Sequence, residues 1–269
     1  MLRLPAVAGR FYPSDPAELK NLVHQYAKNN LGGTRLPVQA CLVPHAGYLY
    51  SGHVAGEVFS RIIFPKKVLI LGVRHYPKGE RAAILSTGAW RTPLGDAQID
   101  ADLAAALCKA CPLLREDAVA HAAEHSLEVQ LPFLQTLEPD FKFVPVALGT
   151  VRFEDLIHVG QAVAQVIASA GENILLLTTS DLNHYEDDAT TRRKDAKAVD
   201  RLLALDAGGL YNTCSNEAIS MCGLGPAVAM LTALKALNKN HAELVKYATS
   251  ADISGDRSAV VGYAGMIFS

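Results

Sequence analysis

The feature that most constrains the fold is a set of short, almost wholly apolar runs separated by longer stretches of helical periodicity. The runs cover residues 39–43, 66–72, 141–149 and 172–180, and their cores read ACLV, VLIL, FVPVAL and ILLL. Strands that are buried on both faces read as such continuous apolar runs, and helices cover them from both sides. The alternation predicts an α/β fold with a single three-layer α/β/α arrangement and a mostly parallel or mixed central sheet.

The segments between and after these runs have the spacing of amphipathic helices. They cover residues 14–23, 51–62, 99–110, 125–137, 153–169, 190–205, 208–213 and 225–237. A further short strand is expected at 81–86, and two late strands at 244–252 and 258–268 are expected to form an antiparallel edge. Because no linker composition interrupts the pattern, we expect one domain over residues 1–269.

Charge and composition exclude several functional classes. The chain has 25 basic and 27 acidic residues, well mixed, with a net charge of −2, so it lacks the basic footprint of a nucleic-acid-binding or membrane-surface protein. No apolar run approaches the roughly 20 residues that span a bilayer, and the N-terminus lacks the apolar core of a signal peptide. Five scattered cysteines do not form a disulfide framework. We therefore expect a soluble cytoplasmic protein.

Three histidines stand at one kind of position, immediately after a strong strand. His45 follows the first run, His75 follows the second, and Asp181 and His184 follow the run at 172–180. In open α/β sheets, ligands bind outside the carboxyl ends of the strands. This convergence is the main chemical signal in the sequence, because two imidazoles and one anionic ligand make a metal site with open positions. The residues alone leave the anion open among Asp181, Glu128, Asp252 and Cys222.

A rival motif lies at His121-Ala-Ala-Glu124-His125, which matches the H-x-x-E-H pattern of inverted zinc proteases. That chemistry needs both histidines on one face of one helix, whereas the pattern here predicts a helix that starts only near residue 125 or 126. We therefore interpret His125 as a hydrogen-bonding residue near a helix start that helps to build the floor of the pocket. The sequence has no G-x-G-x-x-G after a strand, no P-loop and no G-x-S-x-G elbow.

The chain carries a series of motifs, which in order are AGRFYPSD, VPHAGYLYSG, LILGVRH, RTPLGD, EHSLEVQLPFL, TSDLNHY and MCGLGP. Through these motifs, in the same order, the chain resembles the Memo family over nearly its whole length. The Memo fold is similar to that of class III extradiol ring-cleavage dioxygenases, which hold non-haem Fe(II). The resemblance implies that His45, His75 and Cys222 are the metal ligands, with Asp181 and His184 beside the ion. A thiolate is softer than a carboxylate, so copper or zinc is an alternative to iron.

The resulting hypothesis is a metal-dependent oxidoreductase of dioxygenase type that holds one divalent ion, with iron expected first. His184 would act as general acid/base, and Asp181 would orient or ionise its imidazole. The side chains expected to line the substrate pocket are Tyr48, Tyr50, Arg74, His125, Glu128 and Tyr185.

Two alternatives stay open. In each case the substrate or ligand is a small molecule or peptide that these residues do not identify. The first is a non-catalytic peptide- or ligand-binding adaptor that keeps a dioxygenase-like fold. The second is a zinc-dependent hydrolase, because two histidines and a cysteine also suit catalytic zinc. The resemblance further implies the AmmeMemoRadiSam system, with AMMECR-like and radical-SAM proteins as partners.

Overall fold

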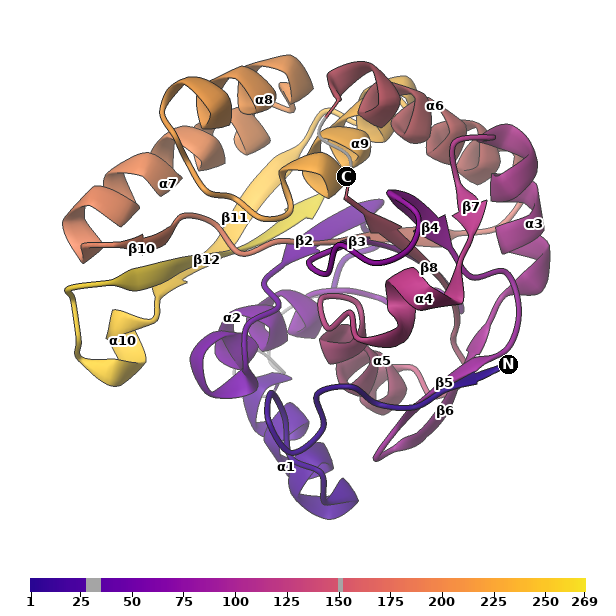
Figure 1. Ribbon diagram of the computed structural model, residues 1–269, viewed down its shortest axis with the longest axis horizontal. Helices are drawn as coiled ribbons and strands as arrows, with labels where there is room; N and C mark the ends of the chain where they lie inside the picture. The colour runs from indigo at the N-terminus through magenta and orange to yellow at the C-terminus, as the bar shows by residue number, and fades with distance from the viewer. Residues whose placement is uncertain (28–34, 150–151) are drawn as a thin grey trace.

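The four apolar runs form the centre of one sheet in the computed structural model, which describes residues 1–27, 35–149 and 152–269 (Figure 1). They are β2 (Ala40–Val43), β3 (Lys67–Val73), β8 (Lys142–Leu148) and β9 (Ile174–Thr179). Their order is β8-β3-β9-β2, and all neighbours are parallel. Only the lysines at the starts of β3 and β8 are not buried, as strands covered on both faces require.

Antiparallel strands extend the sheet beyond β2. The chain's last strand, β12 (Val260–Phe268), pairs with β2 on one side and with β11 (Ala242–Thr249) on the other. The short β10 (His184–Glu186) also pairs antiparallel with β12. The predicted antiparallel pairing of the two late strands is therefore confirmed, and β12 lies between β2 and β11.

Short strands extend the sheet beyond β8. There, β6 (Gly95–Ile99) runs parallel to β8 and forms a hairpin with β5 (Ala89–Thr92), which pairs with β1 (Leu2–Arg3). The predicted strand at 81–86 is β4 (Ala82–Ile84), which joins β8 to β7 (Arg115–Glu116). The β5–β6 hairpin escapes sequence analysis because its strands are short and β6 is half exposed, so they carry no long apolar signal.

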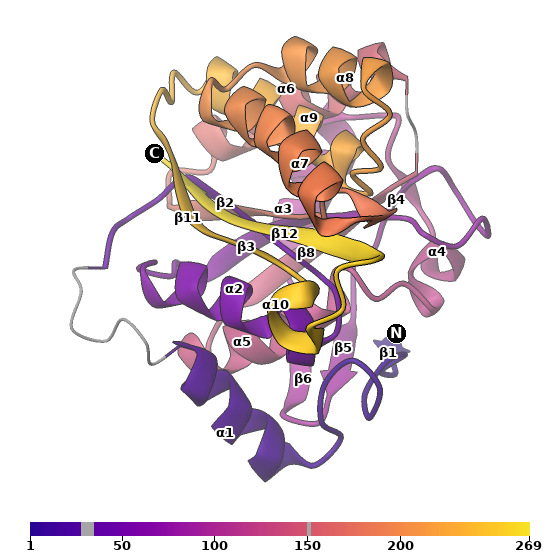
Figure 2. The same ribbon diagram turned by 90° about the vertical axis from the view of Figure 1, so that its left-hand side faces the viewer.

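Helices cover both faces of the sheet, which gives the predicted three layers (Figure 2). One face packs against α1 (Pro16–Ala27), α2 (Tyr48–Ser60) and α5 (Leu131–Leu137). The helices of the other face are α3 (Ala101–Ala110), α6 (Phe153–Ser169), α7 (Asp188–Leu203), α8 (Ala207–Asn216) and α9 (Leu224–Ala236). The α/β prediction is confirmed. In the part of the chain that is described, no helix combines the length and apolarity needed to cross a membrane.

The segment predicted as one helix over 125–137 is divided. Within it, a single 3-10 turn, η2 (Glu128–Gln130), precedes α5, and a separate short helix, α4 (Ala118–Ala122), lies before the segment. Pro132 occupies the start of α5, where its missing N–H costs nothing. Residues 123–127 therefore connect α4 to η2, and His125 lies in this connection, where its carbonyl accepts the Val129 N–H at 3.1 Å. The small α10 (Ala251–Ser254) follows β11.

A buried carboxylate on α7 predicts a measurable pH dependence of stability. Asp195 is fully buried and accepts hydrogen bonds from the Tyr247 hydroxyl, at 2.6 Å, and the Asn183 N–H, at 2.9 Å. Burial raises its pKa from 3.8 to about 6, with these hydrogen bonds opposing the shift. Since the folded pKa is the higher one, Asp195 costs no stability below pH 4, and the cost grows to about 3 kcal/mol as the pH rises through 6.

We expect Asp195→Asn to remove this cost, because an amide stays neutral and can still accept from Asn183 N–H. Urea unfolding of wild type and variant at pH 4 and pH 7 measures this difference in the free energy of unfolding. Relative to wild type, the variant should gain about 3 kcal/mol in free energy of unfolding between the two pH values. Equal pH dependence in both proteins would contradict the assignment.

Candidate metal centre

Two of the predicted histidines meet at the carboxyl edge of the sheet. His45 and His75 each stand two residues beyond the end of a strand, β2 and β3, and β9 lies between these strands. Because all three strands are parallel, their carboxyl ends lie at one edge. The imidazole centroids of His45 and His75 are 5.1 Å apart, with the rings nearly perpendicular at 81°.

A third histidine joins them from the connection between α4 and η2. The His125 ring stacks on His75 with centroids 4.5 Å apart and lies 5.6 Å from the His45 centroid. One ring nitrogen from each of His45, His75 and His125 lies within 4.8 Å of the others, so this histidine group could bind a metal ion. Sequence analysis expected His125 only as part of the pocket floor; the fold brings it into the group itself.

His45 is held on three sides. Its Nδ1 lies 2.6 Å from Thr179 Oγ1, and its backbone N–H donates to Asp181 Oδ1 at 2.8 Å. Its Nε2 is left to face Cys222 Sγ at 3.1 Å. Burial, followed by the neighbouring His75, lowers the pKa of His45 well below its usual value. The ring is therefore neutral at pH 7, as metal ligation requires.

Cys222 reaches His45 because a glycine follows it. A Cβ at Gly223 would lie 2.5 Å from Thr179 O and would also strike Ser180, so only glycine allows this approach to the end of β9. Burial and the charge of Asp181 raise the pKa of the Cys222 thiol, which keeps it protonated unless a cation is near. Nitrogen and sulfur ligands of one tetrahedral ion lie about 3.5 Å apart by their bond lengths, close to the observed separation from His45.

His75 is held by a buried glutamate. Its Nδ1 lies 2.9 Å from Glu124 Oε1, and its backbone N–H donates to Glu124 Oε2 at 2.6 Å. Glu124 is fully buried, which raises its pKa, but the hydrogen bonds from His75 and Ser126 N–H outweigh burial and bring the pKa to about 2. Glu124 is therefore an anion at neutral pH, and the Nε2 of His75 is free for an ion.

The His125 ring also has the protonation state and the unpartnered nitrogen that suit a place beside a metal ion. Burial, then the neighbouring His45, lowers the pKa of His125 to about 4, so its ring is neutral. Its Nδ1 is buried and has no hydrogen-bond partner among the described residues; Glu124 Oε1 is 3.7 Å away. A neutral, unpartnered ring nitrogen beside two others can bind an ion or face one of its open positions.

His184 lies on β10 and is oriented by Ser220. Its Nδ1 lies 2.9 Å from Ser220 O, and its backbone N–H donates to Ser220 Oγ at 2.8 Å. Since a carbonyl can only accept, Nδ1 donates to it, and in the neutral ring Nε2 carries the lone pair. Asp181, expected to orient or ionise this ring, accepts from His45 N–H through its Oδ1, and its role toward His184 stays a prediction. Burial raises the pKa of Asp181, and that hydrogen bond and the charge of His184 oppose the shift.

The three tyrosines expected in the pocket are placed differently from one another. Tyr48 is buried in the core, where its hydroxyl donates to Val129 O at 2.6 Å. Tyr50 is 38% exposed, and Tyr185 is 78% exposed at a positive φ of 61°, which non-glycine residues rarely adopt. The exposed pair can thus meet a ligand from solvent, whereas Tyr48 serves packing.

The charged residues expected in the pocket have other contacts. Arg74 Nη1 donates to the carbonyls of Lys78 and Gly79, both at 3.2 Å, and so holds its own loop. Glu128 is fully buried and accepts from four donors in the N-terminal segment, which are Arg3 Nη1, Ala6 N–H, Val7 N–H and the Tyr12 hydroxyl. Both contacts are structural, and a part in substrate binding stays a prediction for each residue.

Several residues of the site carry no sequence signal that we used. Thr179 and Ser220 orient His45 and His184, Phe11 packs on His125 with ring centroids 4.8 Å apart, and Tyr263 is buried on β12. Burial and the nearby Asp181 raise the pKa of Tyr263, which keeps it a hydrogen-bond donor. A signal was available in the motifs AGRFYPSD and TSDLNHY, which contain Phe11 and Thr179, and in MCGLGP, which directly follows Ser220.

The rival H-x-x-E-H interpretation fails on geometry. His121 lies on α4, whereas His125 lies beyond the end of that helix. The His121 ring is buried against Trp90, with centroids 5.6 Å apart, and is not in the histidine group. The two histidines therefore do not share a helix face, which the protease motif requires.

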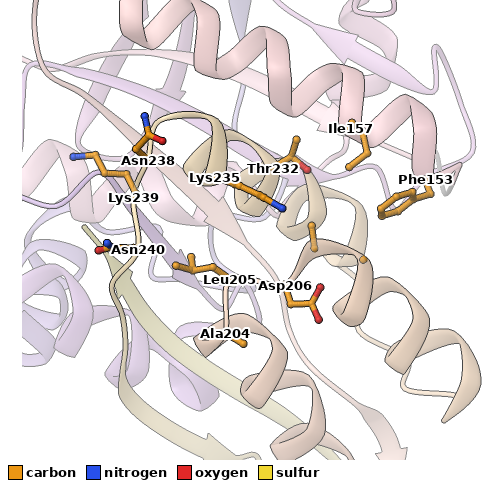
Figure 3. A pocket seen from close by; sticks show the side chains of 12 residues that line it. Phe153, Ile157, Ala204, Leu205, Asp206, Thr232, Lys235, Asn238, Lys239 and Asn240 are labelled. Atoms are coloured by element: carbon orange, nitrogen blue, oxygen red, sulfur yellow. The ribbon is translucent and has the colours of Figure 1, made fainter.

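A surface pocket of about 820 Å³ lies elsewhere, between α6, the α7–α8 connection and the end of α9. Figure 3 shows Phe153, Asp206 and Lys235 among its lining residues. None of the residues that line it belongs to the histidine group. The hollow is therefore separate from the candidate metal centre.

Comparisons with known proteins agree with the motif resemblance. A family profile described as Memo-like protein matches residues 3–267. A MEMO1 family protein of Methanopyrus kandleri is 41% identical over 100% of this chain and 99% of its own length, and one of Methanocaldococcus jannaschii is 40% identical over 99% and 98%. Among solved structures, an uncharacterized protein from Escherichia coli K12 has a TM-score of 0.55 at 11% identity and covers 86% of this chain and 99% of its own, which shows a shared fold.

Proposed function

Since the chain belongs to the Memo family, we propose that it is a metal-dependent oxidoreductase of dioxygenase type with one divalent ion at the carboxyl edge of its sheet. The observation that carries the proposal is the histidine group of His45, His75 and His125, whose nitrogens lie within 4.8 Å of one another. Groups of neutral imidazoles with nearby anionic ligands are typical of non-haem metal sites.

His45, His75 and Cys222 would hold the ion, and His125 would face its remaining positions. The 3.1 Å separation of Cys222 Sγ from His45 Nε2 supports the cysteine as a ligand. When bound, the ion would supply open coordination positions and redox chemistry for the oxidation of an organic substrate by O₂. Iron is the first candidate; the thiolate makes copper or zinc the alternatives.

The chain's own residues would bind the substrate and move its protons. His184 Nε2 is free to take a proton because Nδ1 is committed to Ser220 O. Tyr50 on α2 and Tyr185 on β10 are exposed, both interact electrostatically with Tyr263, and they would contact the substrate at the entrance. Tyr263 and Asp181 would form the polar inner wall of the substrate site. Both are buried, and they interact electrostatically with each other.

The experiment is metal analysis of anaerobically purified protein, followed by O₂ consumption with catechol-like compounds. We expect close to one ion per chain and O₂ uptake that depends on both the ion and the organic compound. O₂ uptake by the loaded protein that is the same with and without every compound tested counts against the oxidoreductase.

Two other outcomes identify the alternatives. Amide or ester hydrolysis that continues without O₂ in zinc-loaded protein identifies a zinc hydrolase, which the histidine and cysteine donors also suit. Protein that takes up none of the three metals but binds peptides identifies a non-catalytic binding module.

A further inference from the structure

Glu124, the acidic residue of the rejected protease motif, makes contacts that concern the metal centre. Its carboxylate accepts three hydrogen bonds, from His75 Nδ1–H at 2.9 Å, His75 N–H at 2.6 Å and Ser126 N–H at 2.9 Å. We propose that Glu124 is a positioning residue of the metal centre, which fixes the tautomer of His75 and joins His75 to the connection that carries His125. The inference rests on the proposed function.

The hydrogen bonds determine which nitrogen of His75 is available. A carboxylate oxygen can only accept, so the contact with Oε1 keeps the proton on Nδ1 and leaves the lone pair on Nε2. Carboxylate–histidine pairs of this kind orient metal-binding imidazoles and raise their basicity. Glu124 acts on the ion through His75, since the glutamate itself is fully buried.

The same residue joins two segments that are about 50 positions apart in the chain. Glu124 accepts from His75 after β3 and lies next to His125 in the α4–η2 connection. Ser126 adds a second link: its Oγ accepts from Val73 N–H at 3.0 Å and donates to Val73 O at 3.1 Å. The stacking of His75 on His125 follows from these links, because both ends of the pair are held.

The backbone of Glu124 is held from the opposite side. Arg3 Nη2 donates to Glu124 O at 2.6 Å, and Arg3 Nε donates to His121 O at 2.7 Å. The Arg3 guanidinium is itself buried and paired with Glu128 at 2.6 Å. The segment that carries Glu124 is therefore rigid, which a positioning residue needs if it is to hold a ligand in place.

An amide cannot replace this carboxylate. If the oxygen of a glutamine faced His75 Nδ1–H and Ser126 N–H, its NH₂ would face the His75 backbone N–H, donor against donor. In the reverse orientation the NH₂ would face Nδ1, which favours the tautomer with the proton on Nε2 and removes the lone pair that the ion needs. Either arrangement weakens metal binding without a change in side-chain volume.

The test compares Glu124→Gln with wild type in two measurements. Titration of metal-free protein with Co²⁺, followed by absorbance, should show a 10- to 100-fold weaker affinity, roughly the effect of losing such a partner. Nitrogen-15 NMR of the histidine rings in metal-free protein should show the His75 proton on Nδ1 in wild type and partly on Nε2 in the variant. A merely structural role would lower thermal stability without this change of tautomer.

The control is Asp100→Asn, which also neutralises a buried carboxylate that accepts a backbone N–H, here that of Leu103 at the start of α3. It should leave Co²⁺ affinity unchanged. If Glu124→Gln does not fold, Glu124→Asp keeps the charge and withdraws the carboxylate by about one carbon–carbon bond, roughly 1.5 Å; its affinity should also fall.

Unchanged affinity and unchanged tautomer in the variant that folds overturn the inference. Failure of the proposed function is distinguishable, because it is seen in wild-type protein, either as no binding of the added ions or as metal-loaded protein without substrate-dependent O₂ uptake. In that case the NMR measurement on metal-free protein still decides whether Glu124 sets the tautomer of His75.

Discussion

Replacing His45 with alanine is expected to weaken metal binding by at least about a hundredfold, more than the loss of a residue that only supports a ligand. His45 is buried, neutral and in contact with Cys222, and it shares the site with the two other histidines. The substitution removes the ring nitrogen at the end of β2 and leaves Thr179 Oγ1 without this partner, whereas Asp181 can still accept the backbone N–H of residue 45. The measurement is metal content after anaerobic loading with Fe²⁺, together with titration.

The same measurement on Cys222→Ser and His125→Ala decides the ligand set. If the cysteine is a ligand and His125 faces an open position, Cys222→Ser should lose most of the ion and His125→Ala should keep it. The matched control is His158→Ala, an exposed histidine on α6 outside the group. Full metal content in both His45→Ala and Cys222→Ser would refute the proposed centre.

Replacing His184 with alanine should lower the rate of turnover by about 10²–10⁴, the usual contribution of a general acid/base, and leave metal content unchanged. The reason is geometric: the Nδ1 of His184 is bound to Ser220 O, and its Nε2 is free and partly accessible. His184 is not in the histidine group that could bind the ion, so its loss should separate proton transfer from metal binding.

The rate is measured as substrate-dependent O₂ consumption by metal-loaded protein, with His158→Ala again as the control. Added imidazole should restore part of the rate of His184→Ala, because a diffusible base can enter the space that the side chain leaves. A variant with wild-type turnover would show that the proton is moved by another group. A variant that loses its ion would instead place His184 among the ligands.

Much of the fold could be predicted because its signals are local. Each central strand is a run of buried apolar residues, and each large helix has its own periodicity, so ACLV or ILLL indicates its environment without reference to the rest of the chain. The β5–β6 hairpin could not be predicted in this way, since exposed polar residues interrupt its strands, and β6 depends on pairing with β8.

The candidate site could be predicted only in part. His45 and His75 follow strands directly, so the rule that ligands lie at the carboxyl ends brings them to one edge of the sheet. His125 follows no strand, and nothing local distinguishes it from a residue at a helix start. Glu124 was visible only as part of a motif with a different chemistry. Whether either residue meets His75 depends on how a distant connection packs against the end of β3.

Local sequence patterns suffice for the layers, the central strands and the two histidines at their ends, because burial of apolar runs and strand direction are encoded within a few neighbouring residues. Tertiary structure alone decided that His125 completes the group, that Ser220 orients His184, and that Glu124 is an anion bound to His75. The physical reason is that protonation and hydrogen-bond partners depend on which distant groups exclude water together, and the order of residues along the chain does not specify these groups.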